Sequence, residues 1–174
     1  MTPPKTWIAV LAVATGAGCS PALDWREFVP EGSGVQAAFP CRPDRHARAV
    51  VVAGAKAQMD MVVCAAGQAT YAISYFDVAD PARVSATLAD WRGTAVANVR
   101  GAEQRLAPVQ IDGMTANDNA LRITVAGRLP DGSAVQEHAA FFTHGLRVYQ
   151  ATVIGAKPAP QDVDTFFAAL KFPQ

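Results

Sequence analysis

Histidine is the side chain most often used for acid–base catalysis and metal binding near neutral pH, and the chain has three. His46 lies among basic residues, His138 lies beside Glu137 in a predicted strand, and His144 lies at a turn. These spacings match none of the short motifs through which histidines bind zinc. No serine stands on the sharp strand-to-helix turn that a serine nucleophile requires. The sequence therefore predicts no catalytic residue, no metal site and no cofactor.

The basic residues around His46 are the stronger candidates for ligand binding. Arg45 and His46 lie with Arg42 and Arg48 in a segment that we expect to be a loop. Guanidinium and imidazolium groups donate charge-assisted hydrogen bonds to phosphate and carboxylate. Arg45, His46 and Arg147 are therefore candidate ligands of a small anionic molecule. A solvated loop explains the cluster equally well without any ligand.

A leader with the order of a secretory signal peptide precedes Cys19. Lys5 is followed by an apolar run at 7–14 and by the small residues at 16–18. A positive start, a short apolar stretch and small residues at the cleavage site define such a signal. As a helix, residues 7–18 would rise about 18 Å, which is too short for a hydrocarbon core of roughly 30 Å. We predict that residues 1–18 are a signal peptide.

A cysteine placed directly after these small residues resembles the signal of bacterial lipoproteins. In that family the signal is cleaved before the cysteine, which then carries fatty acyl chains. The resemblance implies lipidation of Cys19, a membrane partner reached through the acyl chains, and a location facing the periplasm. Ser20 at the next position favours the outer membrane over the inner membrane in that pattern. An ordinary secretory signal with an incidental cysteine is the alternative.

With Cys19 assigned to lipid, two cysteines remain in an exported chain. Such a pair predicts a disulfide between Cys41 and Cys64. Closing a loop of this length stabilises a fold by about 3 kcal/mol in the chain-entropy model. Free buried thiols are the alternative.

Composition limits the class of partner. Removal of residues 1–18 leaves 156 residues, the size of one domain. Without Lys5 the chain has 14 basic and 15 acidic side chains, a net charge of −1. This balance, without a run of like charges, argues against a nucleic-acid partner.

Turn residues divide the chain into elements. Residues 19–34 carry Pro, Gly and Ser around Trp25 and Phe28, and we expect the lipidated cysteine and a tether here, followed by one domain at 35–174. Alternating apolar segments bounded by Gly, Pro and Asp predict antiparallel strands. They cover 35–39, 47–53, 57–65, 68–78, 103–111, 121–126, 134–143 and 146–154.

Two segments have helical periodicity. Asp80 and Pro81 predict a helix start, and the apolar residues that follow repeat at steps of four, three and four. These residues are Val84, Leu88, Trp91 and Ala95. Asp162 and Asp164 favour the first turn of a final helix with its own apolar stripe. That stripe comprises Val163, Phe166, Phe167 and Leu170.

The order of these elements resembles the Mog1/PsbP-like domains found in many bacterial lipoproteins. The likeness lies in Phe39-Pro40 and in residues 71–73, 147–149 and 166–172. It implies an α+β fold, with an antiparallel sheet of about six to eight strands covered by a central long helix and a C-terminal helix. It also implies a binding or assembly role rather than catalysis.

We therefore expect a lipid-anchored protein of the cell envelope that binds or organises an envelope protein partner. A domain that binds a small anionic ligand is the alternative. A hydrolase remains a third hypothesis, which requires two titratable groups that folding brings together in a pocket.

Overall fold

The computed structural model describes residues 23–173, so the expected signal peptide and the lipidation site Cys19 lie outside the described residues. The described chain forms nine strands, one 3₁₀ helix and two α-helices. In chain order they are β1 (Arg26–Phe28), β2 (Ala37–Phe39), β3 (Asp44–Val52), β4 (Ala55–Ala66), β5 (Ala69–Asp77), η1 (Pro81–Arg83), α1 (Val84–Asn98), β6 (Ala102–Pro108), β7 (Leu121–Arg128), β8 (Ala134–His144), β9 (Arg147–Gly155) and α2 (Pro160–Ala168).

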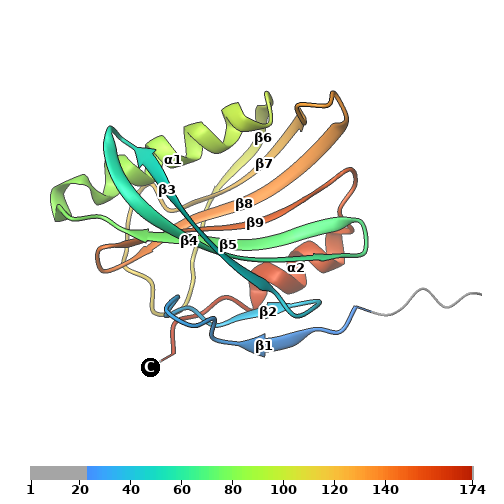
Figure 1. The fold of residues 1–174 in the computed structure, drawn as a ribbon, viewed down its shortest axis with the longest axis horizontal. Coiled ribbons are helices and arrows are strands. Elements are labelled where there is room, and N and C mark those ends of the chain that lie inside the picture. The colour runs from blue at the N-terminus through green and yellow to red at the C-terminus, as the bar shows by residue number, and fades with distance from the viewer. Residues whose placement is uncertain (1–22, 174) are drawn as a thin grey trace, which may run out of the picture.

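Seven of the strands form one antiparallel sheet in the order β3-β4-β5-β9-β8-β7-β6 (Figure 1). Tight turns join β3 to β4, β4 to β5, β7 to β8 and β8 to β9, as short antiparallel connections allow. The last strand, β9, lies in the middle of the sheet between β5 and β8. The α+β class and the antiparallel sheet predicted from the sequence are thereby confirmed.

The first expected strand, 35–39, does not join this sheet. Its central part, β2, pairs instead with β1 in a separate two-stranded sheet, in which Phe28 is opposite Ala37. All three residues of β2 are buried because α2 covers it. Trp25 and Phe28 pack against the core, so the expected tether is fixed to the domain from Leu23 onward.

The two faces of the large sheet are covered by different elements (Figure 1). On β5, Tyr71 faces α2, with its ring centroid 5.5 Å from that of Phe166. Phe76 faces α1, with its ring centroid 4.8 Å from that of Trp91. We call the side covered by α1 the α1 face, and the side covered by β1, β2 and α2 the hairpin face.

The first helix forms as its sequence predicts. The Asp80 side chain accepts a hydrogen bond from the Ala82 backbone N–H at 2.9 Å, and Pro81 opens the short helix η1 that leads into α1. The predicted stripe is buried on α1 together with Thr87. Its burial on the sheet, rather than helix propensity alone, stabilises α1.

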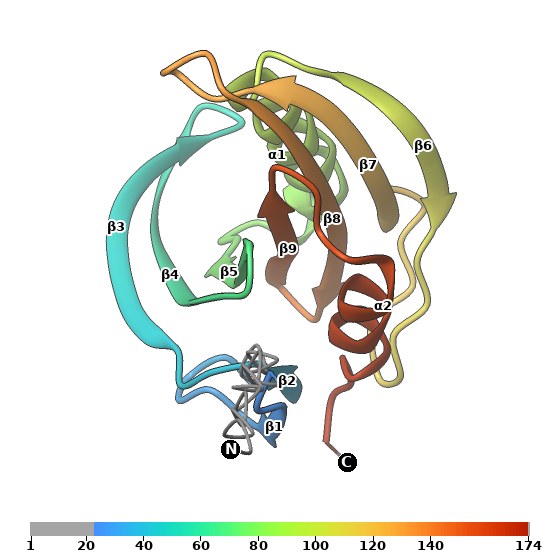
Figure 2. The ribbon, with the colours of Figure 1, turned by 90° about the vertical axis from the view of Figure 1, so that its right-hand side faces the viewer.

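The sheet curves around α1 (Figure 2). Hydrogen bonds join the two on both flanks. At the β3–β4 turn, the Ala53 N–H donates to Asp90 Oδ2 at 2.8 Å, and Arg83 Nη2 donates to the Ala53 carbonyl. These contacts hold Ala53 at a φ of 49°, which a non-glycine residue rarely adopts. On the opposite flank, the Arg128 N–H donates to the Val99 carbonyl at 2.6 Å. The α1 face is therefore concave.

Cys41 and Cys64 form the predicted disulfide, with their Cα atoms 5.9 Å apart. The bridge connects the segment after β2 to β4, and so joins the small sheet to the large one. Among residues 23–173, neither helix is long and apolar enough to cross a membrane.

Replacement of both bridged cysteines by serine lowers the free energy of unfolding by about 3 kcal/mol, because the unfolded chain regains the conformational freedom of the closed loop. Urea unfolding of the purified domain measures this loss. A reducing agent should destabilise the natural protein and leave the double variant unchanged. Equal stability of oxidised and reduced natural protein would contradict the expectation.

Candidate functional site

A groove lies between α1 and the concave face of the sheet. The groove consists of two adjoining hollows. The hollow at the mouth has a volume of about 490 Å³, and the hollow beneath the helix has a volume of about 430 Å³. Apolar side chains form most of the walls of the hollow beneath the helix. They are Met59, Met61, Val63, Trp91, Val99, Leu129 and Ile154.

Short side chains on neighbouring strands make the hollow possible. Ala72 on β5 is opposite Thr152 on β9, which in turn is opposite Ala139 on β8. Above this row α1 contributes Ala95 to the lining. Larger residues at these positions would fill the space, as they do where Trp91 meets Phe76.

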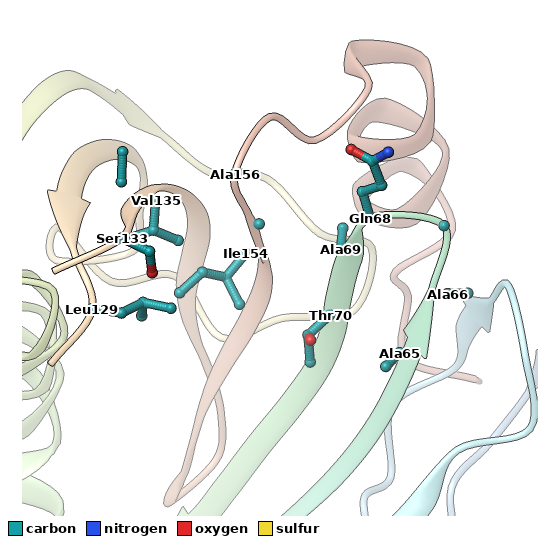
Figure 3. A pocket seen from close by; sticks show the side chains of 13 residues that line it. Ala65, Ala66, Gln68, Ala69, Thr70, Leu129, Ser133, Val135, Ile154 and Ala156 are labelled. Carbon is teal, nitrogen blue, oxygen red and sulfur yellow. The ribbon is translucent and has the colours of Figure 1, made fainter. Parts of the chain in front are cut away.

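The groove opens at the end of the sheet formed by the β4–β5 and β7–β8 turns (Figure 3). The mouth and the hollow beneath the helix share Thr70, Leu129 and Ile154, so they adjoin. Gly67 lies on the rim, and a Cβ atom at this glycine would lie 3.7 Å from Leu23 Cδ2. The start of the described chain therefore lies beside the mouth.

Polar side chains form the floor of the groove on the three central strands. Glu137 on β8, Ser74 on β5 and Thr152 on β9 are 4%, 8% and 9% exposed. Gln150 Nε2 donates hydrogen bonds to Glu137 Oε1 at 3.3 Å and to Thr152 Oγ1 at 3.0 Å. Thr70 completes the set. Such a cluster is unusual on a covered sheet face, where apolar residues are the rule.

Burial raises the pKa of Glu137, and the hydrogen bond from Gln150 offsets part of this rise. The resulting pKa is about 7. No charged group contributes to this shift. Glu103, two strands away on β6, is ion-paired with Arg92 of α1 at 3.3 Å. Glu137 therefore changes charge near neutral pH.

Arg147, a predicted ligand residue, lies on the hairpin face and is engaged within the protein. Its Nε and Nη2 atoms donate to the two carboxylate oxygens of Asp77 at 2.6 and 2.8 Å, and Nη1 donates to the Gly32 carbonyl at 2.5 Å. The paired hydrogen bonds raise the pKa of Arg147 and lower that of Asp77. The structure therefore gives Arg147 a role in holding the loop before β2.

Arg45 and Arg147 both lie close to Gly32, and Arg45 is also paired. It lies 3.3 Å from Asp60 and 3.6 Å from Glu31. Counted with Asp77, three carboxylates surround the two arginines, which does not favour a further anion.

His46 is separated from these arginines, because it points to the opposite face of the sheet. It is exposed and lies opposite Met61, which lines the groove. The segment expected to be a loop is strand β3 from Asp44 onward, and alternation along this strand sends Arg45 and His46 to different faces. The structure thus brings Arg45 and Arg147 together without His46.

The other two histidines make local contacts. His138 Nδ1 lies 3.2 Å from Thr124 Oγ1, and burial, with a smaller effect of Arg122, lowers the pKa of His138. His144 stacks on Phe172 with ring centroids 4.4 Å apart. Within residues 23–173, no group of three or more His, Cys, Asp or Glu side chains is placed to hold a metal ion.

The polar floor was not predicted from the sequence. Ser74 and Glu137 match no catalytic motif, and neither Gln150 nor Thr152 belongs to a recognisable motif. A usable signal was present, since Gln150 and Thr152 point to one face of β9, between the apolar residues Val148 and Ile154. Polar residues at alternate positions of a central strand indicate a site on that face.

Comparisons with known proteins give no family for this chain. No family model matches it, and no curated protein matches it. The solved structures with detectable similarity include that of PA94, a protein of unknown function from Pseudomonas aeruginosa. It is 14% identical, with a TM-score of 0.38, over 68% of this chain and 86% of that chain. Similarity at this level supports no inference about fold or function.

Glu137→Gln makes the stability of the domain less dependent on pH. Between about pH 4.5 and 7 the folded protein holds a proton on Glu137 that the unfolded chain has lost, so the free energy of unfolding falls as the pH rises. The free energy of unfolding of the variant lacks this fall. Between pH 4.5 and pH 8 it therefore rises relative to that of the natural protein by up to about 3 kcal/mol.

Chemical unfolding at several pH values measures this difference, with the exposed Glu27→Gln as the matched control. The control should follow the natural protein at every pH. A Glu137→Gln curve parallel to that of the natural protein would show that Glu137 ionises normally.

Proposed function

We propose that this protein is a non-catalytic binding protein of the bacterial cell envelope, held by a lipid on Cys19 at the periplasmic side of the outer membrane, and that it binds a small amphiphilic molecule in the groove. One observation carries the binding function. The floor of an apolar groove contains polar side chains that are more than nine-tenths buried, namely Ser74 and Glu137.

Folding energetics support a binding role for this floor. A buried polar group costs free energy unless hydrogen bonds replace those it made to water. Ser74, Thr152 and Glu137 would be replaced by apolar residues if the sheet needed only to pack against α1. Residues that reduce stability and line a cavity are typical of binding sites.

The composition of the groove favours binding over turnover. Its lining beneath α1 includes one carboxyl group, Glu137, and one guanidinium group, Arg48. Arg48 comes from the edge strand β3, and three strands separate it from β8. A hydrolytic site would need a second titratable group near Glu137. We therefore place binding ahead of the hydrolase hypothesis.

Membership of the Mog1/PsbP-like domains is part of the same proposal. The supporting observations are the antiparallel sheet, the long helix on one face and the terminal helix on the other. The anionic ligand expected at Arg45, His46 and Arg147 has less support, because both arginines are paired with carboxylates.

Ala72→Leu should abolish binding of an apolar fluorescent probe, N-phenyl-1-naphthylamine, because the larger side chain fills the groove floor. Ala72 is half-buried and lines the groove, so the substitution removes space and no polar group. Probe emission should rise on titration of the natural protein and remain near the buffer value with the variant.

Ala47→Leu is the matched control for this titration, because Ala47 is exposed on β3 and does not line the groove. It should bind the probe like the natural protein. Absence of probe binding by the natural protein, or equal binding by Ala72→Leu, would refute the groove as the binding site.

Cys19→Ser should release the protein from membranes, because serine cannot carry the acyl chains. Two or more such chains give stable anchoring. Membrane fractionation of the host and intact mass of the mature protein measure this outcome. The natural protein should begin at Cys19 and carry added acyl mass. A soluble natural protein without that mass would contradict the proposed anchor.

A further inference from the structure

We propose that the ligand of the groove is an amphiphilic amine, whose ammonium group pairs with the Glu137 carboxylate while its apolar chain lies against the methionines and Leu129. This inference rests on the proposed binding function and adds the chemical class of the ligand. It is drawn from the position of Glu137, from the charges around it and from the hydrogen-bonding groups beside it.

Glu137 has capacity to accept a ligand. A carboxylate has about four acceptor positions on its two oxygens. Among the described residues its hydrogen-bond partner is the Gln150 amide, at the long distance of 3.3 Å. The remaining acceptor positions belong to a side chain that is 4% exposed and lines the groove. A ligand in the groove can therefore bond to it directly.

Among the side chains that the structure describes, the residues around Glu137 supply no cation to balance it. On β7, Val125 is opposite Glu137, and on β9 its neighbour is Ile154. Ala95 and Asn98 of α1 line the groove, together with Val99 at the end of the helix. None of these residues carries a charge.

The charged groups on the surrounding elements are occupied or remote. Arg92 of α1 is paired with Glu103 of β6. Arg48, on edge strand β3, is separated from β8 by β4, β5 and β9. A buried carboxylate without a protein cation is complemented by a positively charged ligand.

Neighbouring groups fit the remaining donors of an ammonium ion. An ammonium group has three N–H donors and no acceptor. On β9, the strand next to Glu137, the hydroxyl oxygen of Thr152 can accept, and Gln150 bonds to both Glu137 and Thr152. The Gln150 carbonyl oxygen is a further acceptor, since its amide nitrogen is used by Glu137 and Thr152. One cationic head can thus be held by the neighbouring strands β8 and β9.

Other head groups fit less well. A ligand carboxylate would place a second acid beside Glu137, and two carboxyl groups that share a site cannot both ionise easily. An alcohol would make hydrogen bonds but would leave the Glu137 charge uncompensated. The apolar chain is accommodated by Met59 and Met61, whose flexible side chains adapt to ligand shape.

Three molecules with the same tail test the inference: octylamine, octanol and octanoate, titrated calorimetrically into the natural protein at pH 8. Octylamine should bind roughly tenfold more tightly than octanol, because a charge-assisted hydrogen bond adds about 1.5 kcal/mol or more. Octanoate should bind weakest. Equal affinities, or tightest binding of octanoate, would overturn the amine assignment.

Glu137→Gln should remove the preference for octylamine over octanol, while the exposed Glu27→Gln should keep it. Lowering the pH from 8 to 5.5 should weaken octylamine binding to the natural protein, since Glu137 gains a proton below about pH 7. Octanol binding should not change over this range. A preference for the amine that survives Glu137→Gln would overturn the role of this residue.

Failure of the inference is distinguishable from failure of the proposed function. If N-phenyl-1-naphthylamine binds and Ala72→Leu blocks it, the groove is a binding site whatever the head-group preference. The three octyl compounds then decide the ligand class alone. If neither the probe nor any octyl compound binds, the binding function and the amine assignment both fall.

Discussion

The attachment of the curved sheet to both flanks of α1 is the constraint from which the rest of the structure follows. Asp90 and Arg83 hold the β3–β4 turn on one flank, and the Val99 carbonyl holds the end of β7 on the other. A flat sheet would meet a single helix along one line and would leave no enclosed space. Because the sheet bends around α1 and carries short side chains at its centre, part of its inner face stays open beneath the helix.

The two faces of the sheet divide structural and binding roles between them. On the hairpin face, Tyr149 donates to the Ser33 carbonyl at 2.8 Å and Arg147 fixes the same loop, so polar groups there are used to secure chain segments. On the α1 face, Ser74 and Glu137 are buried with spare hydrogen-bonding capacity. The strand β9 carries residues of both kinds, because successive side chains alternate between the faces.

Local patterns in the sequence predicted the local structure well. The capping of η1 by Asp80, the buried stripe of α1 and the disulfide all depend on residues close in sequence or on residue type alone. Long-range geometry was not predictable in this way. The pairing of Arg147 with Asp77 joins residues 70 positions apart, and it turned an expected ligand residue into a structural one. The groove likewise depends on the curvature of the sheet, which no local pattern specifies.

The position of Leu23 beside Gly67 at the mouth of the groove has a consequence for how a ligand would arrive. If Cys19 is the anchor, the three residues 20–22 separate it from Leu23, and the four Cα–Cα steps reach about 14 Å at most. The opening would then stay within the headgroup region of the bilayer or just above it. A poorly soluble molecule could pass between the lipid leaflet and the groove without diffusing through bulk water, and lengthening the linker would slow that exchange.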